Sequence, residues 1–66
     1  MNILKLRGKI VEKGINVETL ANNINIDRAT LYRKLNDGER FTIGEALRIK
    51  DVLNLSVEEA CSIFLE

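Results

Sequence analysis

The apolar residues recur at steps of three and four along the chain, the spacing that places side chains on one face of an α-helix. The 66-residue sequence divides at this spacing into five short segments. Its β-branched residues never alternate over a useful length, so no strand is predicted. We therefore expect an all-α fold, a compact five-helix bundle that forms a single domain over residues 1–66. The expected helices run from Asn2 to Gly14, from Asn16 for about two turns, from Arg28 to about Asn36, from Thr42 through Leu53, and from Ser56 onward.

The expected helix ends coincide with residues that satisfy terminal backbone groups. Asp27 precedes the third segment, where its carboxylate can accept a hydrogen bond from a first-turn amide. Thr42–Glu45 and Ser56–Glu59 both match the capping box that opens a helix. Gly14 and Asn25 tolerate the left-handed backbone that closes one. These residues place the boundaries more firmly than the apolar spacing does.

The apolar face of each helix predicts the core. The residues expected to point inward are Ile3, Leu6, Ile10, Leu20, Ala21, Ile24, Leu31, Leu35, Val57, Ala60, Cys61 and Phe64. We assign Cys61 to packing rather than to a reactive thiol. Ile63 and Leu65 lie partly off this face of the last helix, so we expect them to contact a second subunit, with Leu4 and Val11 as rival candidates.

Composition excludes several classes of function. The chain has no histidine and one cysteine, so it forms no internal disulfide and no zinc site of the usual ligands, and we expect no cofactor. It has no Gly-rich phosphate loop and no nucleophile beside an obvious base, so we expect no enzyme activity and no small-molecule ligand. Lys5, Arg7 and Lys9 interrupt the apolar N-terminal residues, which excludes a signal sequence, and no apolar run is long enough for a membrane helix. A cytoplasmic location is the default.

The charges are unevenly distributed, although the formal net charge is zero. Residues 1–50 contain all ten basic side chains and six of the ten acidic ones, whereas Asp51, Glu58, Glu59 and Glu66 follow with no basic residue. This predicts a positive end and a negative end, and a positive end is compatible with a nucleic-acid partner. Ordinary surface solvation explains the same distribution equally well.

The second and third helices are separated by only three residues, 25–27. So short a connection forces the two helices to cross steeply, as in helix-turn-helix DNA-binding proteins. The methyl group of Ala21 allows a close approach, and Ile24, Ile26 and Leu31 can fill the wedge between the helices. The pattern is thus typical of a helix-turn-helix.

The segment from Gly14 to Gly38 resembles the Cro and repressor type of helix-turn-helix family of phage and bacterial regulators, the lambda-repressor-like domains. The likeness rests on Leu20, Ala21, Ile24, Ile26, Asp27, Arg28, Thr30, Leu31, Asn36 and Gly38, and five helices at this length extend it over nearly the whole chain. The resemblance implies that residues of about 17–36 form the helix-turn-helix. It also implies base contacts by Arg28, Ala29 and Arg33, and DNA-backbone contacts near Asn16 and Val17. The chain departs from the family pattern at Val17, usually glutamine, at Asn25, usually glycine, and at Lys34, usually apolar.

Helical geometry gives the same face independently. Leu31 and Leu35 define the buried side of the third helix, and at about 100° per residue Ala29, Arg33 and Asn36 lie opposite. Arg33 suits a bidentate contact to guanine, Arg28 a neighbouring base or a phosphate, and Ala29 a thymine methyl group. Phosphate contacts are expected from Thr30, Tyr32, Asn36 and, in the following loop, Arg40.

We therefore expect a transcription regulator, a phage or prophage repressor that binds a pseudo-palindromic operator in double-stranded DNA as a homodimer, or as a dimer that forms only on DNA. The alternative is a protein-binding module of the same fold, such as an antitoxin or anti-repressor, that presents its acidic C-terminal end to a basic partner. Salt dependence separates the two, because only DNA binding releases counterions from phosphates.

Overall fold

Helices alone make up the regular structure of the described residues. The computed structural model describes residues 1–65, and residue 66 of the expected domain lies outside them. The helices are α1 (Ile3–Glu12), α2 (Val17–Ile24), α3 (Arg28–Asp37), α4 (Ile43–Val52) and α5 (Val57–Phe64), with no strand within residues 1–65. The predicted all-α, five-helix fold is confirmed.

The helices begin at the residues expected to cap them. The side chain of Asn16 accepts a hydrogen bond from the Thr19 amide at 2.8 Å, and Asp27 accepts one from the Ala29 amide at 3.0 Å. The helices α4 and α5 each open with a complete capping box, headed by Thr42 and Ser56. Each box satisfies two amides that would otherwise lack a partner, which fixes where the helix starts.

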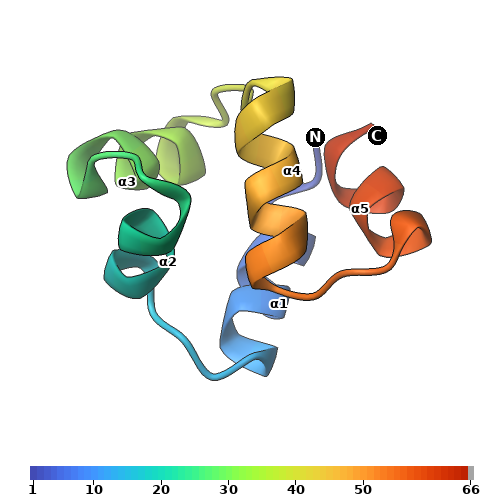
Figure 1. Cartoon of the computed structure of the whole chain (residues 1–66). Coiled ribbons are helices and arrows are strands. Elements are labelled where there is room, and N and C mark those ends of the chain that lie inside the picture. The colour runs from blue at the N-terminus through green and yellow to red at the C-terminus, as the bar shows by residue number, and fades with distance from the viewer. Residues whose placement is uncertain (66) are drawn as a thin grey trace.

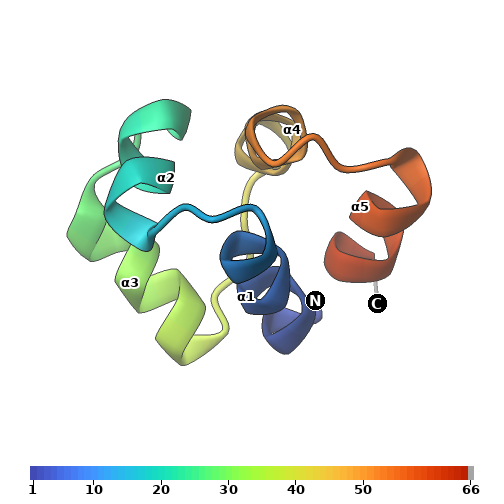
Figure 2. The same ribbon diagram turned by 90° about the horizontal axis from the view of Figure 1, so that it is seen from below.

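Helix α4 lies in the middle of the molecule, with α2 and α3 on one side and α5 on the other (Figure 1). Helix α1 lies beneath α4. Figure 2 shows the same order from below, so α3 and α5 lie at opposite ends of the molecule. The core between the helices consists of Leu6, Ile10, Leu20, Ala21, Ile24, Leu31, Leu35, Ile49, Leu53, Leu55 and Ile63. The inward faces predicted for α2 and α3 are confirmed.

Helix α5 is rotated from its predicted orientation. Val57 is 67% exposed and Cys61 is also exposed, so their assignment to the core is wrong. Ile63 is fully buried instead, and its carbonyl accepts a hydrogen bond from the Asn2 amide at 2.7 Å. A buried side chain has no surface to offer a second subunit, so the expected subunit contact by Ile63 is wrong as well. Leu65 remains exposed, at 79%.

Polar side chains join helices that are distant in sequence. Lys9 of α1 forms ion pairs with Glu12 and with Glu59 of α5. The hydrogen bond from Lys9, together with the amide of Ser56, lowers the pKa of Glu59 from 4.5 to about 2. On the other side of the molecule, the Arg48 guanidinium donates to the Ile24 carbonyl at 3.2 Å and so ties α4 to the end of α2.

Candidate nucleic-acid interface

The connection between α2 and α3 is a tight turn. Asn25 adopts the left-handed conformation expected of it, with φ of 60°, and Asp27 begins α3 two residues later. The Ile26 amide donates to the Ala21 carbonyl at 3.1 Å, and the Ala21 side chain is buried. The turn therefore sends α3 across α2 and places α3 at the outer edge of the molecule (Figures 1 and 2).

The outer face of α3 is the one that helical geometry predicts. Leu31 and Leu35 point into the core, with 0% and 2% of their surface exposed. Ala29, Arg33 and Asn36 are exposed on the other side. The flanking residues differ, because Tyr32 is 43% exposed whereas Thr30 is half-buried. Contact of these residues with DNA stays a prediction.

Each of the two arginines on α3 forms an ion pair with an acidic residue outside the helix. The Nε of Arg33 lies 2.6 Å from a carboxylate oxygen of Glu39, in the loop after α3. The Nη1 of Arg28 lies 3.3 Å from a carboxylate oxygen of Glu18 on α2. All four side chains are roughly half exposed, so each pair contributes about 0–1 kcal/mol to stability. The ion pairs therefore affect the orientation of the two arginine side chains more than the stability of the fold.

The predicted backbone-contact residues lie around this face in different environments. The side-chain oxygen of Asn36 accepts a hydrogen bond at 2.7 Å from Arg7 of α1. At the start of α2, the Asn16 oxygen is engaged in capping and the Val17 side chain packs against the core. Because the first amides of a helix have no partner within it, the α2 N-terminus supplies the donors that a phosphate needs.

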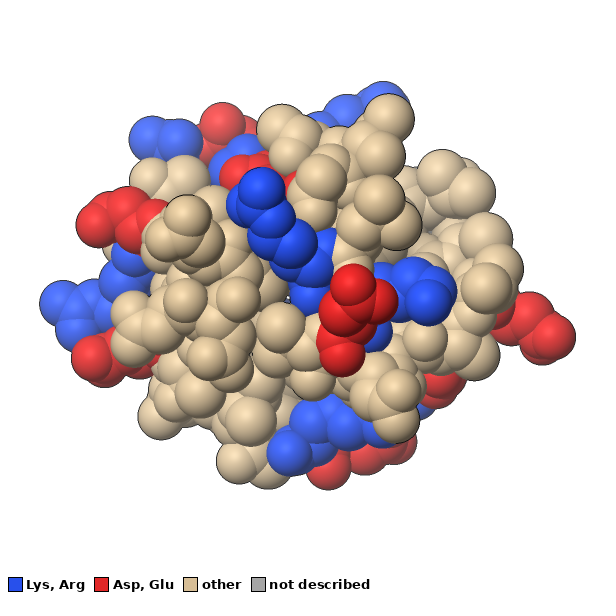
Figure 3. All heavy atoms as spheres, in the orientation of Figure 1, with Lys and Arg blue, Asp and Glu red and all other residues tan. Residues whose placement is uncertain are grey.

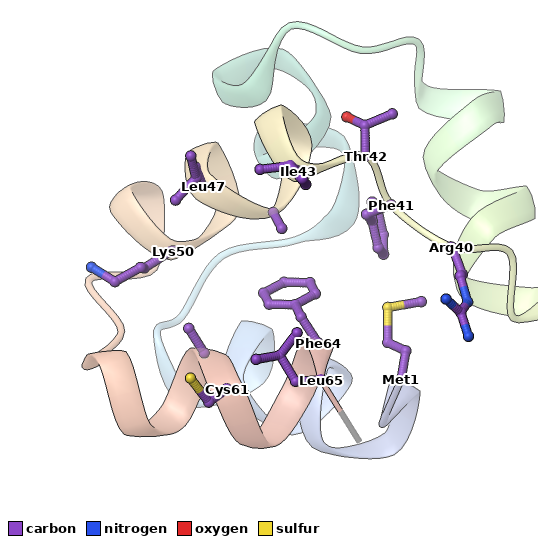
Figure 4. Close-up of a pocket in the computed structure, with 12 residues that line it drawn as sticks. Met1, Arg40, Phe41, Thr42, Ile43, Leu47, Lys50, Cys61, Phe64 and Leu65 are labelled. Atoms are coloured by element: carbon purple, nitrogen blue, oxygen red, sulfur yellow. The ribbon is translucent and has the colours of Figure 1, made fainter.

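Arg40, the remaining phosphate candidate, lies in the loop before α4. Its side chain lines a hollow between α4 and α5 together with Met1 (Figure 4). Phe41 and Phe64 face each other inside this hollow, with ring centroids 6.1 Å apart and planes at 86°. The structure therefore does not gather Arg40 with Arg28 and Arg33 on one helix face.

Lys34 fills the position on α3 where the family usually has an apolar residue. Only 11% of its side chain is exposed, and its ammonium lies 5.5 Å from the centre of the Phe41 ring. The ammonium also donates to the Arg40 carbonyl at 3.0 Å and lies 3.4 Å from Glu45. Burial would raise the pKa of Glu45, but the hydrogen bond from the Thr42 amide and the charge of Lys34 outweigh it and lower that pKa. Lys34 thus packs with its hydrocarbon stem and anchors the loop with its charge.

On the face of the molecule shown in Figure 3, basic and acidic side chains alternate rather than forming one basic patch. On the face in Figure 3, blue and red atoms lie beside one another over the α2 and α3 side, while the surface over α5 is mainly uncharged. Alternation of this kind gives weak attraction to phosphates in general. Any preference for DNA must then come from the particular groups on α3.

Sequence reasoning missed Glu18 and Glu39 as partners of the two arginines. Glu39 follows Gly38, whose φ of 71° turns the chain back toward α3, so an acidic residue directly after a helix-ending glycine was the available indication. Glu18 meets Arg28 only because α2 and α3 cross, which the apolar spacing does not specify in detail. Arg7 of α1 donates to the Asn36 side chain across the helices, a contact that the apolar spacing does not predict.

Residues 1–65 contain no group of three or more His, Cys, Asp or Glu side chains arranged to hold a metal ion. Within the same residues, no helix has the length and apolar character needed to cross a membrane.

Comparison with known proteins identifies a family for the chain. The sequence model of a family described as the Cro/C1-type helix-turn-helix DNA-binding domain matches residues 5–64. No curated protein and no solved structure matches the chain.

Proposed function

The chain belongs to the Cro/C1-type helix-turn-helix DNA-binding family, and on that premise we propose that it is a transcription regulator that recognises a specific sequence in double-stranded DNA. One observation carries the proposal. Arg28, Ala29 and Arg33 are exposed on α3, while Leu31 and Leu35 hold the opposite side of that helix in the core. A recognition helix needs one face that is fixed in the core and an opposite face that is exposed to contact bases.

The proposed roles follow from the side chains. Arg33 contacts O6 and N7 of a guanine, Arg28 a neighbouring base or phosphate, and Ala29 a thymine methyl group. The α2 N-terminus near Asn16 and Val17 positions the domain on a phosphate. Thr30, Tyr32, Asn36 and Arg40 contribute further phosphate contacts. The role is binding without catalysis.

We propose further that two copies bind together to a pseudo-palindromic operator. A two-fold axis would place the two α3 helices in successive major grooves about 34 Å apart. The protomer measures 27 × 22 × 20 Å, and α5 lies at the end opposite α3, so a contact at the α5 end leaves both recognition helices accessible. Occupancy of the operator would exclude polymerase, the mode of action of a phage or prophage repressor in the cytoplasm of a bacterial or phage-infected cell.

Selection from a random duplex library on the purified protein at moderate salt, followed by sequencing, tests the proposal. We expect two inverted half-sites with centres about ten base pairs apart. Enrichment of one half-site would contradict the homodimer while leaving sequence recognition intact. No enrichment by the folded protein would overturn DNA recognition and favour a protein-binding module, such as an antitoxin or anti-repressor.

Arg33→Ala is the matched variant for this selection. It should lower affinity for the enriched site by about 1–3 kcal/mol and relax the preference at one base pair. Lys5→Ala serves as the control, because it removes the same charge from an exposed position on α1 rather than from α3. An Arg33→Ala protein with unchanged affinity would show that the recognition face lies elsewhere.

A further inference from the structure

The ion pair between Arg33 and Glu39 constrains how Arg33 can meet a base. Resting on the DNA-binding function proposed above, we infer that Glu39 is a positioning residue: it holds the Nε of Arg33 so that the two terminal nitrogens of the guanidinium face a guanine. Glu39 thereby contributes to base preference without touching the base.

The geometry of the guanidinium leads to this inference. Its five N–H groups form two edges that can donate a pair of parallel hydrogen bonds, one made by both Nη atoms and one made by Nε with a single Nη. The Glu39 carboxylate lies 2.6 Å from Nε and therefore occupies the second edge. The edge made by both Nη atoms stays available, and it matches the O6 and N7 acceptors of guanine.

Arg28 differs in this respect. Its partner Glu18 contacts Nη1 at 3.3 Å, so the carboxylate engages the edge that a guanine would need. Arg28 has to release Glu18 before it can form the same bidentate contact. The ion pair of Arg33 therefore leaves the edge needed for guanine available, whereas the ion pair of Arg28 occupies it. Arg33 is thus the arginine better prepared for guanine.

The loop that contains Glu39 is itself held in place. Gly38 turns the chain back at the end of α3, and the next carbonyl beyond Glu39, that of Arg40, accepts a hydrogen bond at 3.0 Å from Lys34. Lys34 is in turn fixed by Glu45 at 3.4 Å and by the Phe41 ring. A carboxylate on an anchored loop restricts the Arg33 side chain before DNA arrives, which reduces the ordering that binding must impose.

Charge alone predicts a different result from positioning. If Glu39 were only a negative charge near DNA, its removal would strengthen binding to every duplex by a similar factor. If it positions Arg33, its removal lowers the preference for guanine over the other bases at one base pair. The ratio of two affinities therefore separates the two roles.

The experiment compares Glu39→Ala and Glu39→Gln on the selected operator and on duplexes with each other base at the position that Arg33→Ala relaxes. Both variants remove the same charge, but glutamine keeps an oxygen that can accept from Nε. We expect Glu39→Ala to reduce the guanine preference by up to about fivefold, and Glu39→Gln to restore most of it. In an Arg33→Ala background, Glu39→Ala should change the preference no further. Glu58→Ala, on the exposed side of α5, controls for the lost charge.

A second measurement needs no DNA. In the free protein, the Arg33 Nε–H should show slow solvent exchange and restricted motion by NMR, and Glu39→Ala should remove both while Glu58→Ala leaves them unchanged. Retained guanine preference in Glu39→Ala, with a uniform gain in affinity, would overturn the positioning role and leave the DNA-binding function standing. A wild-type protein that enriches no sequence would overturn both.

Discussion

Lys34 shows how a single charged side chain can occupy a position that usually suits an apolar one. Its ammonium lies over the Phe41 ring and also reaches a carbonyl and a carboxylate, so the Lys34 nitrogen is not left without a partner. A methionine of similar length would pack as well but could not donate to the Arg40 carbonyl. The charge therefore secures the loop that follows α3 rather than the core beneath it.

A substitution at Arg40 can distinguish a phosphate contact from a base contact. Arg40→Ala should weaken binding to the operator and to unrelated duplexes by a similar factor, because a phosphate contact contains no sequence information. The dependence of log affinity on log salt should become shallower by about one unit. Titration of both duplexes over a range of salt concentrations measures this. A loss confined to the operator would show that Arg40 contacts a base.

The exposure of the α3 face was predictable from the sequence, whereas the engagement of its arginines was not. The spacing of Leu31 and Leu35 fixes which side of the helix faces outward, because only one side of a short helix can reach the core. Glu39 reaches Arg33 through the conformation of Gly38 and the anchoring of the loop by Lys34. That contact depends on a turn, for which apolar periodicity contains no information.

Among the elements, the turn between α2 and α3 depends most on one residue. Asn25 has a φ of 60°, a conformation that costs alanine about 1–2 kcal/mol. Asn25→Ala should therefore lower the free energy of unfolding by about 1 kcal/mol, and Asn25→Gly should not. Urea unfolding followed by circular dichroism measures both.

Asn23→Ala is the matched control, since Asn23 is an exposed residue of α2 with ordinary helical conformation. It should leave stability unchanged or raise it slightly, because alanine is the better helix former. An equal loss in Asn23→Ala and Asn25→Ala would mean that the left-handed backbone is not the cause.

Helix boundaries were more predictable than helix orientation. Caps such as Asp27 and Ser56 act locally, so the residues that open a helix can be identified without knowing what it packs against. The rotation of α5 could not be identified in this way, because its apolar residues outnumber the positions on one face. Val57 with Cys61 and Ala60 with Ile63 both satisfy helical spacing, and contact with α1 decides between them.

At the scale of the whole molecule, three of the large exposed apolar residues gather in one place. Ile43, Leu47 and Leu65 line the hollow between α4 and α5, with exposures of 82%, 56% and 79%. If two copies meet there, Leu47→Glu combined with Leu65→Glu should give a monomer in sedimentation velocity and reduce binding to the full operator to that of a half-site. Val11→Glu is the control, because Val11 is 77% exposed on α1. A monomer from Val11→Glu alone would place the contact on α1.

The pair between Lys9 and Glu59 joins the two ends of the chain and makes its stability sensitive to acid. Glu59 has a pKa of about 2 in the fold against 4.5 ordinarily, so the folded protein takes up this proton less readily than the unfolded chain. The resulting stabilisation is present above about pH 4.5 and is lost as the pH falls toward 2. Glu59→Gln should reduce the fall in the free energy of unfolding between about pH 4.5 and pH 2. Glu58→Gln, which changes the neighbouring residue on α5, should leave that fall as it is in the wild type. If the free energy of unfolding falls equally with pH in the wild type and in Glu59→Gln, the pair between Lys9 and Glu59 is not the cause.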